Sequence, residues 1–238
     1  MGLTRRRVLA LPGLLSDDLI WEAQATALGE VADVTVADLS GYDDLTDMAG
    51  PALATVDGRV DVLGHSMGGR VAFETWRQAP DRVASLVVLD TGAHPAGPDE
   101  PKRRQAMLDI SATDGMAALA DAWLPQMVHP DRRSDTNFMQ PLRDMVLRAT
   151  PSQHARQINA LLHRLDARPL LGTITIPTLV VVGRQDEWSP VPQHETIARS
   201  IPGAHLEVIE NSGHMVTLEQ PEAVSAMLAA WLSNLPDC

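Results

Sequence analysis

The sequence predicts an α/β fold, in which a mostly parallel, twisted sheet of about six strands is flanked by helices. Two observations support this. Short apolar runs alternate along the chain with longer segments whose apolar residues recur at helical spacing. In addition, 238 residues with 45% hydrophobic content can bury one substantial core. Such alternation is typical of parallel sheets that carry helices on both faces.

The individual elements follow from these patterns. Strands are predicted at 7–11, 33–37, 60–64, 84–90, 178–183 and 204–209. Helices between and after them are predicted at 17–28, 43–55, 67–79, 191–200 and 219–233.

Residues 93–172 interrupt the alternation. Helical patterning without a strand covers 101–112, 114–128, 134–149 and 151–168. Proline and glycine separate these segments, Pro130 and Pro151 among them. We therefore expect a core formed by 1–92 and 173–238, with a helical insertion at 93–172.

A nucleophile motif lies between a predicted strand and a predicted helix. Residues 64–68 read Gly-His-Ser-Met-Gly, which is G-x-S-x-G in the context of a nucleophile elbow. Gly64 and Gly68 keep side chains out of a tight strand-to-helix turn. The turn places Ser66 at a helix N-terminus, where free N–H groups favour developing negative charge. Ser66 is the predicted nucleophile.

Two later loops supply the predicted partners of Ser66. Asp186 follows the strand at 178–183, and His214 ends the loop that follows the strand at 204–209. A neutral imidazole can accept the serine proton, and a carboxylate on its other nitrogen fixes the required tautomer. The order serine, acid, histidine is the one expected for this kind of elbow.

Four separated segments together resemble the α/β-hydrolase superfamily, from about residue 8 to about residue 232. They are Pro12-Gly13-Leu14-Leu15, the elbow around Ser66, Gly183-Arg184-Gln185-Asp186 and Ser212-Gly213-His214. The resemblance implies that 93–172 is a helical cap over the active site. It also implies that the family's usual leading hairpin is missing, because residues 1–6 are too few for it.

The resemblance further implies an oxyanion hole. The family uses the backbone N–H of the residue after the nucleophile and one from the first loop, which are Met67 and Leu14 in this chain. Pro12 stands where a histidine is usual. Some members take their acid from the strand that here ends in Asp90, so Asp90 is the alternative to Asp186. Asp186 is favoured by the glycine before its loop and by Pro190 after it.

The cap sequence is rich in methionine, which suits an apolar pocket that tolerates different shapes. Trp123, Met127 and Trp188 are expected to line that pocket.

These residues predict a serine hydrolase that cleaves a small carboxylic ester or lactone through an acyl-enzyme. The same triad serves thioester hydrolysis, C–C bond hydrolysis and perhydrolysis. The stretch from Ser66 to Arg70 also resembles that of the menaquinone-pathway synthase, a lyase. A non-catalytic ligand receptor is the alternative from another class, because this fold supports both.

Composition limits the partners. A net charge of −12 argues against nucleic acid and anionic membranes, and no apolar run approaches the roughly 20 residues of a membrane span. No metal-ligand pattern or phosphate loop is present in the sequence, so neither metal nor cofactor is expected. Cys238 is the only cysteine, so an intrachain disulfide is excluded. The basic start of the chain is interrupted by Pro12-Gly13, which favours a first strand over an export signal and hence a cytoplasmic protein. The oligomeric state stays open.

Overall fold

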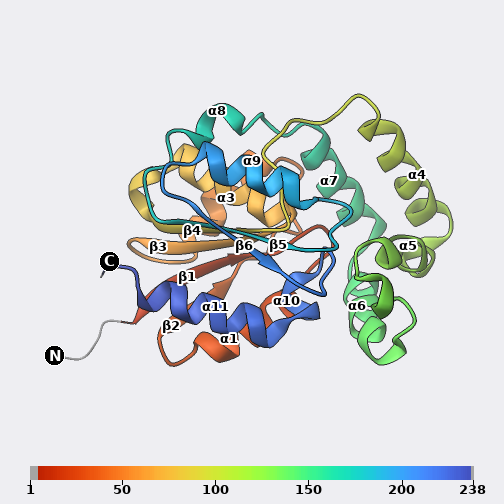
Figure 1. The fold of residues 1–238 in the computed structure, drawn as a ribbon. Coiled ribbons are helices and arrows are strands. Elements are labelled where there is room, and N and C mark those ends of the chain that lie inside the picture. The colour runs from red at the N-terminus through yellow and green to blue at the C-terminus, as the bar shows by residue number, and fades with distance from the viewer. Residues whose placement is uncertain (1–4, 237–238) are drawn as a thin grey trace.

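The computed structural model describes residues 5–236 (Figure 1). Cys238 and the first four residues of the basic N-terminal segment lie outside the described residues, so what the sequence predicts for them is not addressed below.

Six parallel strands form one sheet in the order β2-β1-β3-β4-β5-β6. Their bounds are Arg6–Leu11 (β1), Ala32–Val36 (β2), Val60–His65 (β3), Val83–Leu89 (β4), Thr178–Gly183 (β5) and His205–Ile209 (β6). Every residue of β3, β4 and β5 is buried, as expected for a parallel sheet covered on both faces. The predicted six-stranded parallel sheet with flanking helices is confirmed.

Helices cover both faces of the sheet (Figure 1). On one face lie α1 (Glu22–Leu28), α10 (Val216–Glu219) and α11 (Pro221–Ser233), whereas the other face carries α3 (Met67–Gln78), α8 (Arg168–Leu171) and α9 (Val191–Ser200). The remaining helix of the core, α2 (Leu45–Ala54), packs against α3. The predicted helix 219–233 begins at Pro221, because proline lacks an N–H and suits the first helical turn. The predicted helix 17–28 begins as a 3-10 turn, Asp18–Trp21, which Asp17 caps.

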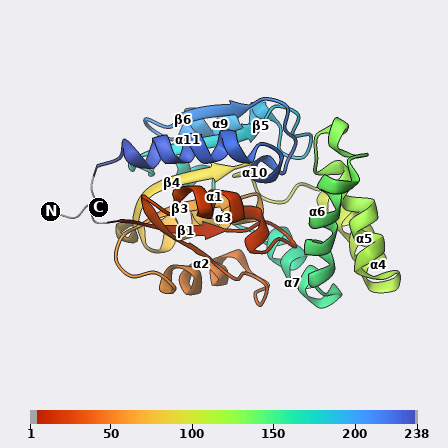
Figure 2. The same cartoon turned by 90° about the horizontal axis from the view of Figure 1, so that it is seen from below.

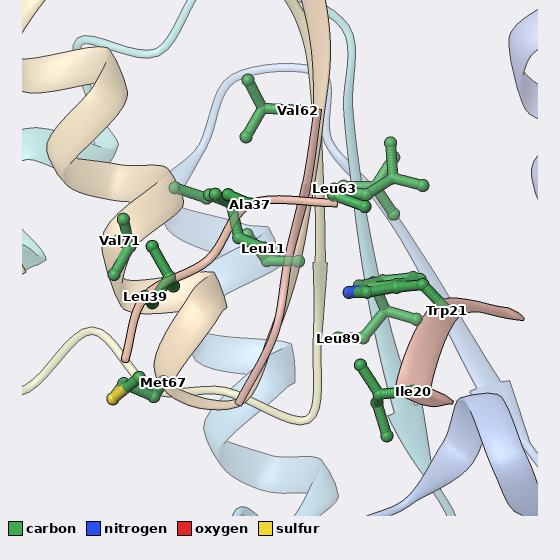
Figure 3. Packing of buried hydrophobic residues seen from close by; sticks show 14 of the residues in the cluster. Leu11, Ile20, Trp21, Ala37, Leu39, Val62, Leu63, Met67, Val71 and Leu89 are labelled. Carbon is green, nitrogen blue, oxygen red and sulfur yellow. The ribbon is translucent and has the colours of Figure 1, made fainter. Parts of the chain in front are cut away.

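The core lies on both sides of the sheet. Figure 3 shows Val71 of α3 on one side of the strands, and Leu63 and Trp21 together on the other. Each of these three side chains is at most 1% exposed. Successive strand residues point to opposite faces, so a strand buried on both sides is apolar at most of its positions instead of at every second one. This is why β3, β4 and β5 were recognisable in the sequence.

Residues 93–172 form α4 (Glu100–Thr113), α5 (Gly115–Trp123), α6 (Thr136–Arg148), α7 (Pro151–Leu162) and α8. The first four of these helices stand beyond one end of the sheet (Figure 2), whereas α8 lies beside α9 on one face. The predicted helix 114–128 was too long, because Pro125 lies in a 3-10 turn that follows α5. The predicted helix 151–168 ends at Leu162 for a different reason. Beyond it the chain turns so that Arg164 bonds the carbonyls of His94 and Pro95. Between residues 5 and 236, no helix is both long and apolar enough to cross a bilayer.

Candidate active site

Ser66 occupies a sharp turn between β3 and α3. Its backbone has φ 54° and ψ −113°, a conformation that a residue with a side chain rarely adopts. A Cβ at Gly68 would lie 2.1 Å from the carbonyl oxygen of Leu11, and one at Gly64 would lie 2.4 Å from that of Gly68. Both glycines are therefore required by close backbone approach, and the turn presses the start of α3 against the end of β1.

A hydrogen-bonded chain joins the three predicted side chains. His214 Nε2 lies 2.8 Å from Ser66 Oγ, and His214 Nδ1 lies 2.8 Å from Asp186 Oδ2. The second carboxylate oxygen of Asp186 accepts the backbone N–H groups of Trp188 (2.9 Å) and Ser189 (2.8 Å). With Nδ1–H donated to the carboxylate, Nε2 is left to accept the serine proton.

The surroundings of Asp186 keep it ionised. Burial acts to raise the pKa of Asp186, but the charge of His214 and its hydrogen bond outweigh burial, so the pKa lies below its ordinary value. A carboxylate in this state can stabilise an imidazolium when His214 takes up a proton.

The alternative acid, Asp90, has other partners. It follows β4 at φ 47° and is fully buried. Its oxygens accept the backbone N–H groups of Gly183 (2.9 Å) and Val216 (3.3 Å), whereas the imidazole of His214 bonds Asp186. Burial, assisted by the charge of Asp186, raises the pKa of Asp90 well above its ordinary value. Asp90 thus links the loops that carry Asp186 and His214.

His65, beside the nucleophile, supports the loop of His214. Its Nε2 lies 2.7 Å from the carbonyl oxygen of His214, to which it donates. Burial, and then the charge of His214, lower the pKa of His65 to about 3, so its ring stays neutral. The sequence showed only a histidine inside the elbow motif and did not predict this contact.

Glu219 ties the histidine loop to the helical segment, and no sequence signal pointed to it. Its two oxygens accept the backbone N–H groups of Gly213 (2.9 Å) and His129 (2.6 Å). The backbone N–H of His214 in turn donates to the carbonyl of Met127 at 2.9 Å. Burial raises the pKa of Glu219, although these hydrogen bonds oppose the change.

The two predicted oxyanion donors border the same space. Met67 is the first residue of α3, a position at which the helix offers its N–H no acceptor. The N–H of Leu14 has no acceptor among residues 5–236, whereas the N–H of Leu15 donates to Gln157 of α7 at 2.9 Å. Leu14 and Met67 both line a cavity that also contains Ser66 and His214.

That cavity measures about 170 Å³ and lies between the sheet and the helical segment. Trp123, Met127 and Trp188 are among the residues that line it. The expectation of an apolar pocket was incomplete, because charged side chains form much of the wall: Arg70, Arg103, Arg104, Arg164, Glu100 and Glu187. Within the described part of the chain, no group of histidine, cysteine and acidic side chains is arranged to hold a metal ion.

Comparisons with known proteins identify the family of this chain. Residues 4–227 match the model of the alpha/beta hydrolase family. The chain is 30% identical over 219 residues to a pimeloyl-(acyl-carrier protein) methyl ester esterase of Neisseria meningitidis, covering 86% of this chain and 69% of the relative. It also resembles a malate-bound thermophilic esterase from Thermogutta terrifontis, with a TM-score of 0.87 and 30% identity over 97% of this chain and 90% of the esterase. The enol-lactonase of Burkholderia xenovorans LB400 shares the fold, with a TM-score of 0.87 at 23% identity over 97% of this chain and 92% of the lactonase.

A parallel sheet with a strained serine at a strand-to-helix turn is the architecture of hydrolases that carry a nucleophile elbow. The match to the family model identifies the family within this class. The chain belongs to the alpha/beta hydrolase family, and esterases are among its relatives.

Proposed function

We propose that this protein is a serine hydrolase that cleaves a small carboxylic ester or lactone through an acyl-enzyme intermediate. The observation that carries the proposal is the hydrogen-bonded chain from Ser66 through His214 to Asp186, with 2.8 Å at each bond. Because each bond has the length of a good hydrogen bond, proton transfer needs no rearrangement of these side chains.

In the proposed reaction, Ser66 Oγ attacks the carbonyl carbon while its proton moves to His214 Nε2. The carbonyl oxygen becomes negative and accepts the N–H groups of Met67 and Leu14. The tetrahedral centre collapses, and the leaving alkoxide takes the proton from His214. Water then repeats the sequence at the acyl carbon, which releases the acid and restores Ser66.

We also propose that residues 93–172 act as a cap over the site. Trp123 and Met127 come from this segment and share the cavity with Ser66. The bonds from Glu219 to His129 and from His214 to Met127 fix the cap to the histidine loop. On this proposal Trp123, Met127 and Trp188 contact the substrate.

The relatives favour ester bonds over the other bonds that such a triad can cleave. Two proteins at 30% identity, from Neisseria meningitidis and Thermogutta terrifontis, are described as esterases. The proposal is tested against five alternative functions. They are thioester hydrolysis, cleavage of a β-diketone, perhydrolysis, a lyase reaction and ligand binding without catalysis.

The test is a turnover screen of p-nitrophenyl esters, lactones, acyl thioesters and β-diketones. We expect turnover of esters or lactones by the wild type and a loss of about 1,000-fold or more in kcat for Ser66→Ala, because triad members act as a unit. Ser200→Ala, which removes an exposed hydroxyl on α9, is the matched control.

Retention of more than about a tenth of the wild-type rate by Ser66→Ala would contradict the nucleophile assignment, since tenfold is only about 1.4 kcal/mol of barrier. Turnover of thioesters or diketones alone would contradict the ester assignment and leave the triad in place. No turnover of any substrate would favour a receptor.

A further inference from the structure

Three arginines converge on the cavity beside Ser66, and one buried carboxylate faces them. Arg70 comes from α3, Arg104 from α4 and Arg164 from the turn after α7, while Glu100 begins α4. The group therefore carries three positive charges and one negative charge. Arg103 and Glu187 also reach the cavity, but they are exposed and of opposite charge.

Arg164 and Glu100 form the structural part of this group. Arg164 donates to both oxygens of Glu100, at 2.9 Å and 2.7 Å, and to the carbonyls of His94, Pro95 and Leu161. Burial would raise the pKa of Glu100, but the hydrogen bonds and charges of its arginines outweigh burial and lower it to about 2. Every nitrogen of the Arg164 guanidinium thus has a protein acceptor.

Arg104 has protein acceptors for only some of its N–H groups. Its Nε and Nη2 both bond Glu100 Oε1, at 2.9 Å and 2.8 Å. The guanidinium lies 5.8 Å from the centre of the Trp188 ring, at the edge of the same cavity. Its Nη1 has no acceptor among the described residues.

Of these three arginines, Arg70 has the most guanidinium N–H groups without a protein acceptor among the described residues. It donates a single hydrogen bond within the described residues, from Nη1 to the carbonyl of His94 at 2.8 Å. Its Nε and Nη2 have no acceptor there, although burial and the charge of Arg164 lower the pKa of Arg70 to about 9. Arg70 is half-buried and lines the cavity, so these nitrogens can donate to an anionic ligand there, and hydrogen bonds between two charged groups are strong.

Ser66 precedes the first residue of α3 and Arg70 is the fourth, so the two side chains lie about one helical turn apart on one face. Side chains on a helix point back toward its N-terminus, which directs Arg70 toward the serine. Gly92 leaves room for it, because a Cβ there would lie 2.7 Å from Arg70 Nη2.

We propose that Arg70, assisted by Arg104, binds a carboxylate of the substrate a few bonds from the carbonyl that Ser66 attacks. The substrate class is then a half-ester of a short dicarboxylic acid, or a lactone that bears a carboxylate. Arg164 is a positioning residue that holds Glu100 and the loop at 94–95. The substrate class rests on the proposed esterase function, whereas the anion site itself does not.

The positive charges of Arg70 and Arg164 also affect the protonation of His94 beside them. His94, which lies in the cavity wall, has its pKa lowered to about 4, chiefly by burial and then by the charges of Arg70 and Arg164. A neutral His94 adds no further charge near pH 7, so the excess on the wall belongs to the arginines.

The catalytic test compares two substrates that differ only in charge: monomethyl glutarate and methyl 4-carbamoylbutanoate, its neutral isostere. We expect the wild type to favour the carboxylate by about 10- to 100-fold in kcat/KM, as for a charge-assisted pair of hydrogen bonds. Arg70→Met should reduce this ratio to near one, and Arg70→Lys should retain part of it. Arg199→Met, which removes an exposed charge on α9, should leave the ratio unchanged.

A binding test separates this proposal from the esterase function. Glutarate is titrated calorimetrically into Ser66→Ala and into Ser66→Ala with Arg70→Met, and folding of each variant is checked by circular dichroism. Glutarate binding at least tenfold weaker without Arg70 supports the site even if no ester is turned over. Equal binding by both variants, or a substrate ratio near one in an active wild type, would overturn it. If Arg70→Met does not fold, Arg70→Lys is used in its place, because it keeps a cation and loses the two-pronged donor, and it should lower the ratio. An unchanged ratio in that folded variant would also contradict the proposal.

Discussion

Asp186 and Asp90 are both buried and both follow a buried strand, but their carboxylate oxygens have different hydrogen-bond partners. Asp186 meets His214 Nδ1 at 2.8 Å, whereas Asp90 accepts backbone N–H groups from Gly183 and Val216. The sequence could rank the two only by their loops. The geometry shows which carboxylate reaches the imidazole, and the proposed role of Asp186 follows from it.

We therefore predict that Asp186→Asn lowers kcat by about three to four orders of magnitude near pH 7 without unfolding the protein, because an amide favours the wrong imidazole tautomer. Asp90→Asn should instead reduce stability by about 1–3 kcal/mol, since one amide end would face a backbone donor. Steady-state kinetics and urea unfolding of both variants measure this. The reverse pattern, with the larger kinetic loss in Asp90→Asn, would transfer the acid role to Asp90.

The three triad residues that the sequence predicts share one property: each follows a strand that the sequence also predicts. Ser66 directly follows β3, and Asp186 and His214 lie in the loops that follow β5 and β6, at the carboxyl ends of strands where functional groups collect. Glu100 and Arg164 carry no such local signal. They meet only because α4 and the turn after α7 fold together across 64 positions of the chain.

At the scale of elements, the helical segment supplies part of the wall of the cavity around Ser66. Its helices were predicted from apolar periodicity, and the errors fell at their ends, where Pro125 and the turn carrying Arg164 stop them. The ends depend on tertiary contacts that periodicity does not report. The charged part of the cavity wall was missed for the same reason, because its arginines come from α3, α4 and the turn after α7, which meet only in the folded chain.

A cavity of about 170 Å³ closed by helices predicts a limit on acyl length. Among neutral p-nitrophenyl esters, kcat/KM should rise from acetyl to roughly butyryl or hexanoyl, by up to about 0.8 kcal/mol per buried methylene. It should then fall, because overpacking costs about 1–3 kcal/mol. Trp123→Ala should move the optimum to longer chains, and Leu147→Ala, an exposed truncation on α6, should not. A flat profile to long chains would indicate an open groove instead.

At the scale of the molecule, buried neutral histidines link stability to pH. His194 is fully buried, accepts the N–H of Thr91 at Nε2 (2.8 Å) and bonds the carbonyl of Pro190 at Nδ1 (3.3 Å). Both nitrogens are thus committed in one neutral tautomer. Burial lowers the pKa of His194 to about 4, and of His154 to about 4.

Below about pH 6.5 the unfolded chain binds protons at these histidines while the native chain does not, so acid lowers the free energy of unfolding. Each contributes about 1.4 kcal/mol per pH unit between pH 6.5 and 4, and the loss ends where the native histidine also becomes protonated. Urea unfolding at several pH values should show this slope, and it should be smaller by about one proton in His194→Gln. His163→Gln, at an exposed site after α7, serves as the control. An unchanged slope in His194→Gln would contradict the assignment.

The sheet was predictable because burial on both faces makes β3, β4 and β5 predominantly apolar, although Asp61 and Ser85 interrupt the first two of these strands. The alternation of strands and helices then leaves few topologies, since parallel crossovers are right-handed and short. The packing of the helical segment against the sheet was not predictable. It depends on single contacts such as Glu219 with His129 and Leu15 with Gln157.

The central claim is that Ser66 is the nucleophile of a hydrolase, and stoichiometric labelling with a fluorophosphonate tests it most directly. We predict one phosphonyl group per chain, located on Ser66 by peptide mass spectrometry, with loss of ester turnover in proportion to labelling. The folded Ser66→Ala variant should remain unlabelled. Labelling of another residue, or full ester turnover after Ser66 has been modified, would contradict the account.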